Sequence, residues 1–272
     1  MKKAIVSVII IFLVFCFTGL TSCKNDSRKK QKKEEIEQGK TLEKEIEKHV
    51  YPLPTSAEII KMLTDLEVGY QIGITNPVEN VRAYYTSAKR SINLGVYGAD
   101  LSYVTLYNIE QKVVDYMDGI RTLANDLNMS QVYNAALYDS IKKNFDRRDR
   151  LVGILKNAFN DTYQYMNEND EEAQALLVVG GAWVEGMYLT THVSEAAYNV
   201  AGIAKVLIEQ KNSFDLFLDL TKPYMENPMI SDFVNNLEPI KTVYAGLTTS
   251  LTDKNIKDIT AAMEIIRNKT IN

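Results

Sequence analysis

The chain has 272 residues, with 31 basic and 35 acidic side chains and a formal net charge of −4 at pH 7. This acidic balance argues against a nucleic-acid-binding protein, because such proteins meet phosphate groups with a basic surface. Two cysteines and two histidines are too few for a disulfide-rich fold or for a metal site built from several His and Cys ligands.

The N-terminus has the pattern of an export signal. A basic Lys2-Lys3 pair precedes a mostly apolar run over 4–17, which is shorter than the about 20 residues that span a bilayer. Next comes Leu20-Thr21-Ser22-Cys23, which resembles the lipobox of bacterial lipoproteins. The resemblance implies that residues 1–22 are a signal peptide and that cleavage leaves Cys23 as a lipidated first residue.

The lipobox also implies a membrane anchor at Cys23. In the lipoprotein family this cysteine carries several acyl chains, such as palmitate, and each buried methylene contributes about 0.8 kcal/mol to membrane binding. Loss of Lys2 and Lys3 would leave 29 basic and 35 acidic residues, a net charge of −6. Cys23 would then be the only cysteine, so the mature chain would contain no internal disulfide and would depend on its core for stability.

Residues 23–54 are predicted to form a charged tether. The part over 24–48 is almost entirely polar and cannot bury enough apolar surface to fold alone. It begins with a basic stretch, whose residues would each gain about 1 kcal/mol near anionic lipid head groups. A simply solvated linker explains the same composition, so both interpretations stay open.

Residues 55–272 are predicted to form a single all-α domain, a multi-helix bundle. Start signals recur at helix-like intervals, among them a capping box at Thr55 and the pairs Asn76-Pro77 and Asn227-Pro228. Asn108, Ser130 and Asp170 are further expected N-caps. The apolar residues follow three- and four-residue spacing. The expected helices are 55–67, 77–106, 109–127, 131–144, 147–167, 171–209, 213–224, 228–248 and 254–268.

Prolines and glycines refine this prediction. Pro239 predicts a kink or a break inside the helix over 228–248. Residues 68–75 alternate as a strand would, but glycines interrupt this short segment, which is therefore interpreted as a loop. Glycines at 95, 98, 180 and 181 are expected to let neighbouring helices approach closely.

One candidate ligand site surrounds Asp100, which is the only charged residue from Ser91 to Ile109. A carboxylate cannot stay buried, charged and unpaired, so it must reach water, a cation or hydrogen-bond donors. In a helix, Asn93, Tyr97 and Tyr107 lie close to one side with Asp100, and Tyr103 follows nearby. Either Tyr97, Tyr103 and Tyr107 line the floor of a polar pocket, or Asp100 caps a helix break or joins a satisfied core network.

A second candidate site lies in the long helix predicted over 171–209. Glu185 and His192 are seven residues apart and share a stripe, while Tyr188 and Glu195 flank His192 at helical spacing. Trp183 is the only tryptophan of the chain. The alternative is a polar stripe that faces solvent on an otherwise packed helix.

Neither candidate site predicts a metal or a cofactor. A metal needs several converging ligands, and His192 is the only histidine of the predicted domain. Helical di-iron sites use Glu-x-x-His on two helices, whereas this chain has one His-x-x-Glu. His192 has the pKa range of a general base, but no Gly-x-Ser-x-Gly motif or cysteine nucleophile accompanies it. We therefore expect no catalytic residues, no metal and no cofactor, with the question of enzymatic activity left open.

Two segments, "YPLPTSAEI" and "NLGVYGADLSY", together resemble uncharacterised envelope lipoproteins of Bacteroidota. The resemblance implies a location in the cell envelope and no particular reaction. No dense acidic run follows Cys23, which favours the periplasmic face of the outer membrane over display at the cell surface.

The sequence thus predicts a lipid-anchored helical domain that binds an envelope protein or a small ligand without catalysis. Its expected partners are the membrane and that ligand or protein, with no nucleic acid. Two alternatives remain: a scaffold subunit of an envelope assembly, and a hydrolase-like enzyme that uses His192, Glu185 and Asp100.

Overall fold

The computed structural model describes residues 69–193, 201–247 and 251–272. All of them belong to the larger of two compact units, Glu45–Asn272, while the other unit is Met1–Lys44. The predicted signal peptide, Cys23, the tether over 23–54, the helix over 55–67 and Glu195 lie outside the described residues.

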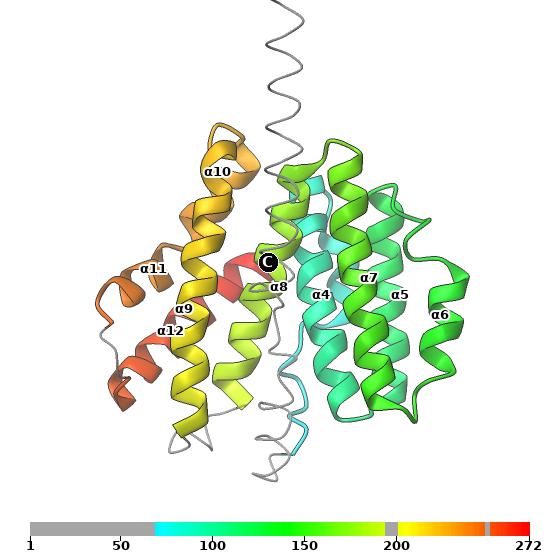
Figure 1. The fold of residues 1–272 in the computed structure, drawn as a ribbon, viewed down its shortest axis with the longest axis horizontal. Helices are drawn as coiled ribbons and strands as arrows, with labels where there is room; N and C mark the ends of the chain where they lie inside the picture. The colour runs from blue at the N-terminus through cyan, green and yellow to red at the C-terminus, as the bar shows by residue number, and fades with distance from the viewer. Residues whose placement is uncertain (1–68, 194–200, 248–250) are drawn as a thin grey trace, which may run out of the picture. The chain divides into compact units, whose positions relative to one another are not determined.

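Every regular element in the described ranges is a helix, which confirms the prediction of an all-α multi-helix bundle (Figure 1). The elements are η1 (Val78–Ala83), α4 (Ser87–Leu106), α5 (Glu110–Asp126), α6 (Ala135–Lys142), α7 (Arg148–Glu168), α8 (Glu172–Val193), α9 (Ala201–Thr221), η3 (Lys222–Tyr224), α10 (Pro228–Asn236), α11 (Glu238–Ala245) and α12 (Asp253–Ile271). Over 69–75 the chain forms a loop, as predicted. Among the described helices, none has the length and apolar character of a membrane span.

Helices α4 and α8 pack against each other at two glycines. A Cβ atom built on Gly95 would lie 2.0 Å from the carbonyl oxygen of Val178, and one on Gly181 would lie 2.0 Å from that of Ile92. Only glycine allows two helix backbones to meet this closely. The expected close approach is therefore confirmed at Gly95 and Gly181. It is wrong at Gly98, where a Cβ would meet no atom of the described part of the chain within 4 Å.

The start of the predicted helix over 77–106 is divided in the structure. The 3-10 helix η1 ends at Ala83, and α4 begins after Thr86, whose side chain accepts a hydrogen bond from the backbone N–H of Lys89 at 3.1 Å. Between them Tyr84 is buried, and its carbonyl accepts a hydrogen bond from Arg90 Nε at 3.1 Å. The helix is interrupted because Tyr84 turns into the core.

Three helices end at a non-glycine residue with a left-handed backbone, namely Asn108, Asn128 and Asp170 at φ of 56°, 60° and 60°. At the end of α4, the N–H of Ile109 donates to the carbonyl of Val104 at 3.1 Å, which is the Schellman pattern of a helix C-terminus. Asn and Asp tolerate this conformation better than other side chains. The prediction that Asn108 and Asp170 start helices is therefore wrong, since they end α4 and α7. Ser130 is also not a cap, because α6 begins later, after Asn134.

Two predictions about the C-terminal helices had opposite outcomes. The expected break at Pro239 is confirmed, since α10 ends at Asn236 and α11 begins at Glu238. The expected break between 209 and 213 is wrong, because α9 continues from Ala201 to Thr221. Its buried side chains Leu207, Phe214 and Phe217 continue one apolar stripe across that point.

Candidate functional site

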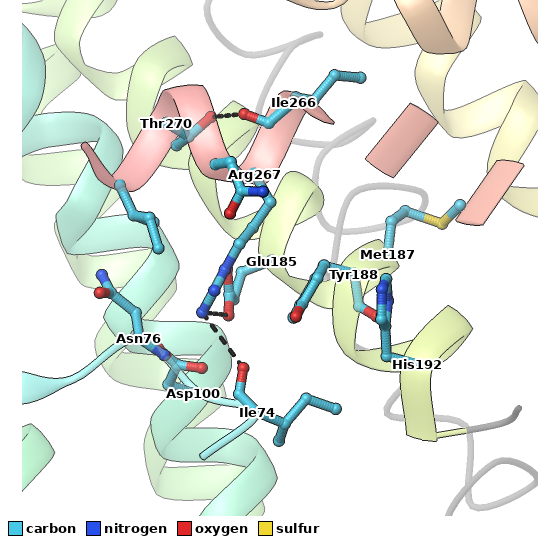
Figure 2. A network of polar contacts seen from close by, with 12 residues as sticks. Ile74, Asn76, Asp100, Glu185, Met187, Tyr188, His192, Ile266, Arg267 and Thr270 are labelled. Carbon is cyan, nitrogen blue, oxygen red and sulfur yellow. Dashed lines mark hydrogen bonds and ion pairs between the residues drawn. The ribbon is translucent and has the colours of Figure 1, made fainter. Parts of the chain in front are cut away.

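A buried polar network lies where α4, α8 and α12 meet the loop before η1 (Figure 2). Asp100 on α4 and Glu185 on α8 are fully buried, and Arg267 on α12 is 7% exposed. Arg267 Nε donates to Glu185 Oε2 at 3.0 Å, and its Nη2 donates to Glu185 Oε1 at 3.1 Å. The same Nη2 donates to the carbonyl of Ile74 at 3.2 Å. Glu185 therefore has its charge matched by a bidentate pair.

Asp100 lies beside this ion pair and is not matched by a cation of its own. Its Oδ2 accepts the backbone N–H of Asn76 at 3.1 Å, whereas its buried Oδ1 has no partner among the described residues. Burial, and next the neighbouring charge of Glu185, raise the pKa of Asp100 well above its usual value of 3.8, while Arg267 acts in the opposite direction. A proton on Asp100 therefore removes one of two neighbouring buried negative charges.

Asn76 connects this network to the rest of the core with all of its polar groups. Besides the bond to Asp100, its carbonyl accepts from the Tyr116 hydroxyl at 2.8 Å, and its Nδ2 donates to the Tyr84 hydroxyl at 3.0 Å and to Asn93 Oδ1 at 3.4 Å. Its Oδ1 accepts from Asn80 Nδ2 at 2.8 Å. The prediction that Asn76 is an N-cap is wrong, because its side chain faces the core instead of a helix N-terminus.

The other α4 candidates hold neighbouring segments in place. The Tyr97 hydroxyl donates to the carbonyl of Pro77 at 2.9 Å, and the Tyr103 hydroxyl accepts the backbone N–H of Gln71 at 3.1 Å. Asn93 Nδ2 donates to the carbonyl of Thr270 at 3.3 Å. Burial raises the pKa of both tyrosines, so their hydroxyls stay protonated. These side chains fix the loop and α12 against α4.

His192 does not meet Asp100. Its ring centroid is 4.0 Å from that of Tyr188, and the Tyr188 ring in turn contacts Arg267, whose Cζ lies 4.4 Å from its centroid. The His192 Nδ1 is 2.9 Å from the carbonyl oxygen of Tyr188. Tyr188 and Arg267 therefore separate the imidazole from the carboxyl pair, as Figure 2 shows.

Trp183 lies apart from the network. Its Nε1 donates to Gln210 Oε1 at 3.1 Å, and its ring packs against Phe214 with centroids 5.1 Å apart. It therefore joins α8 to α9. Within the described ranges, no group of three or more His, Cys, Asp or Glu side chains is arranged to hold a metal ion.

A separate apolar cavity of about 40 Å³ lies between helices α4, α5, α6, α7 and α8. Figure 1 shows α4, α5 and α7 side by side, with α6 on the outside. The lining residues are Leu94, Gly98, Leu101 and Ser102 of α4, Met117 and Ile120 of α5, Leu137, Tyr138 and Ile141 of α6 with the preceding Tyr133, Leu155, Ala158 and Phe159 of α7, and Val178 of α8. None of the eight described candidate residues is among them.

Sequence reasoning missed both Arg267 and this cavity. Arg267 follows Met263 by four residues and lies beside Ile266, in the apolar stripe of the last predicted helix, so an out-of-place charge in that stripe was the available signal. For the cavity the available signal was Gly98, a glycine inside a predicted helix, which the sequence analysis interpreted as a point of close helix approach.

Comparison of the chain with protein-family models, curated proteins and solved structures found no match.

Proposed function

We propose that this protein is an envelope lipoprotein, anchored at Cys23, whose helical domain binds a small apolar ligand without catalysis. The observation that carries the ligand-binding part is the cavity beside Gly98. Apolar cavities stay dry and take up apolar molecules, and Gly98 keeps one wall free of a side chain. Glycine inside a helix is about 1 kcal/mol less favourable than alanine, and the space around Gly98 gives no steric reason for it.

The buried carboxyl pair supports a structural role in this proposal. Both oxygens of Glu185 accept hydrogen bonds from Arg267, and Asp100 is fully buried. A general acid or base must come within hydrogen-bond reach of its substrate. Neither carboxyl group has a free path to one in this arrangement, and His192 is held away from both. We therefore favour binding over hydrolysis.

Native mass spectrometry of the full-length protein extracted from bacterial membranes tests ligand binding. We expect a reproducible mass excess over the lipidated chain, which is lost in Gly98→Leu and kept in Gly153→Leu. Gly153 is a matched control because it also lies inside a helix, α7, where an added Cβ would meet nothing within 4 Å, and it is exposed. The smaller Gly98→Ala gives a second variant if the leucine disturbs folding. An absent excess, or equal loss in both leucine variants, would contradict ligand binding.

The anchor has its own test. Cells that express the full chain are fed an alkyne analogue of palmitate, and the protein is then probed for the label and fractionated with the outer membrane. Wild type is expected to carry the label and to sediment with the outer membrane. Cys23→Ser is expected to lose both properties. A label that persists in Cys23→Ser would refute the lipobox assignment.

A scaffold subunit of an envelope assembly remains the alternative function. Four large apolar side chains in the described ranges are exposed, namely Ile72, Tyr85, Met225 and Ile265. Cross-linking of the full chain in intact envelopes would favour this alternative if one partner protein were captured in stoichiometric amount while no ligand accompanied the protein.

A further inference from the structure

Resting on the proposed function, we propose that the ligand in the cavity beside Gly98 is the end of a linear hydrocarbon chain whose polar head group stays at the protein surface. Three observations carry this inference: the chemistry of the lining, the extent of the wall on α4, and the exposure of the residues at one side.

The lining has no polar group to offer a ligand's charge. Among the described residues that line the cavity none is charged, and each hydroxyl proton has an acceptor within the protein. Ser102 Oγ donates to the carbonyl of Gly98 at 2.9 Å, and the Tyr138 hydroxyl donates to the carbonyl of Met117. An anion or an unpaired carbonyl in this space would lose its hydration without compensation. The bound part is therefore a hydrocarbon.

The Tyr133 hydroxyl proton also has an acceptor within the protein, through a hydrogen-bonded pair of hydroxyl groups. Its hydroxyl oxygen is 2.7 Å from Thr162 Oγ1, and Thr162 itself donates to the carbonyl of Ala158 at 2.7 Å. Since the Thr162 proton is used in that bond, the Tyr133 proton is the one shared between the two hydroxyls. No hydroxyl proton on this wall is left for a ligand.

The shape of the wall favours a chain over a compact ring. The α4 lining residues run from Leu94 to Ser102, which corresponds to about 12 Å along a helix at about 1.5 Å per residue. Gly98 lies midway and leaves the wall without a side chain at that point. A linear chain that lies along this wall would pass Gly98 without meeting a side chain there.

One side of the cavity reaches the protein surface. Gly98, Ser102, Leu137 and Phe159 are half-buried, whereas Leu94, Ile141 and Val178 are buried. A chain that enters between the half-buried residues places its methyl end against the buried ones and keeps its head group near solvent. This arrangement avoids the burial of a polar head group.

The test uses membrane vesicles that contain the full chain and a dodecanoic acid probe with a diazirine beside its terminal methyl group. After irradiation, peptide mass spectrometry is expected to place the label on the α4 and α6 walls, within 94–102 and 137–141. Gly98→Leu is expected to reduce labelling at least about tenfold, since its side chain fills the space, and Gly153→Leu is expected to leave labelling unchanged. Gly98→Ala should give an intermediate reduction.

Competition with unlabelled acids tests the orientation. Dodecanoate should displace the probe, whereas dodecanedioate should require at least about a hundredfold higher concentration, because one of its two carboxylates would have to enter the cavity. Equal displacement by both acids, or labelling indifferent to Gly98→Leu, would overturn the inference. If the Gly98-dependent mass excess in native mass spectrometry persists in that case, the proposed function stands with another ligand class. If that excess is also absent, both proposals fail.

Discussion

Replacement of Asp100 by asparagine tests whether the buried carboxyl group holds a proton. Its pKa is raised well above 3.8 by burial and by the charge of Glu185, so the folded protein keeps a proton that the unfolded chain releases. Stability linked to this group is therefore fully present below the unfolded pKa of about 3.9 and is lost as the pH rises towards the folded pKa. In this window Asp100 by itself should lower the free energy of unfolding by about 1.4 kcal/mol per pH unit.

The asparagine of the Asp100→Asn variant would be neutral at every pH and has the shape of the protonated acid. Its side-chain oxygen can still accept the backbone N–H of Asn76 that Asp100 Oδ2 accepts in wild type. Relative to wild type, the free energy of unfolding of the variant should therefore rise by about 1.4 kcal/mol for each pH unit in that window. At the upper end of the window the variant should be the more stable protein.

Urea denaturation of the full chain, followed by circular dichroism from pH 4 upward, measures this difference. Asp118→Asn is the control because Asp118 is 55% exposed in a surface ion pair with Arg121, and its curve should run parallel to that of wild type. If the Asp100→Asn curve instead runs parallel to wild type over this range, then Asp100 is ionised in the folded protein and the proposed proton is absent.

Three further substitutions test packing and charge by the same denaturation assay. Gly98→Ala should stabilise the fold by about 1 kcal/mol or slightly more, from helix propensity and one buried methyl group, and Gly153→Ala should give the propensity part alone; a destabilised Gly98→Ala would mean that the space is filled. Gly95→Ala should cost about 1–3 kcal/mol or more, because its Cβ would lie 2.0 Å from the Val178 oxygen, and a neutral result would mean that α4 and α8 can separate freely. Arg267→Met should cost about 3–5 kcal/mol by leaving Glu185 buried without its cation, and a loss below about 1 kcal/mol would show that Glu185 reaches water or becomes protonated at little cost.

Features that depend on neighbouring residues in the sequence, such as helix formation and helix breaks, were predicted from the sequence. The three- and four-residue spacing of apolar side chains was enough to identify the helical class, and Pro239 was enough to place the break between α10 and α11. The errors at Tyr84 and Asn76 have one origin: each side chain is turned into the core by partners far away in the sequence, such as the carbonyl of Ile271, which accepts from the Tyr84 hydroxyl at 3.2 Å. Tertiary contacts of this kind override propensity.

Local reasoning of this kind also identified some of the residues in the buried polar network, but not all of them. The principle that a buried carboxyl group must find a partner led to Asp100, and a satisfied core network was one of the alternatives. Helical spacing alone could not show that Arg267, from the last helix, reaches Glu185. The cavity could not be predicted from the sequence because its size depends on the distances among five helices. One of these distances, between α4 and α8, is set by the close approach at Gly95 and Gly181, which exists only in the packed structure.

The pair of Glu185 and Arg267 also bears on the order of events during synthesis. The two residues are 82 positions apart, and a ribosome that adds about 5–20 residues per second makes the glutamate roughly 4–16 s before the arginine. Throughout that interval, burial of Glu185 between α4 and α8 would leave its charge without a counterion. This penalty disfavours closure of the core before α12 is made, which is compatible with the proposed export.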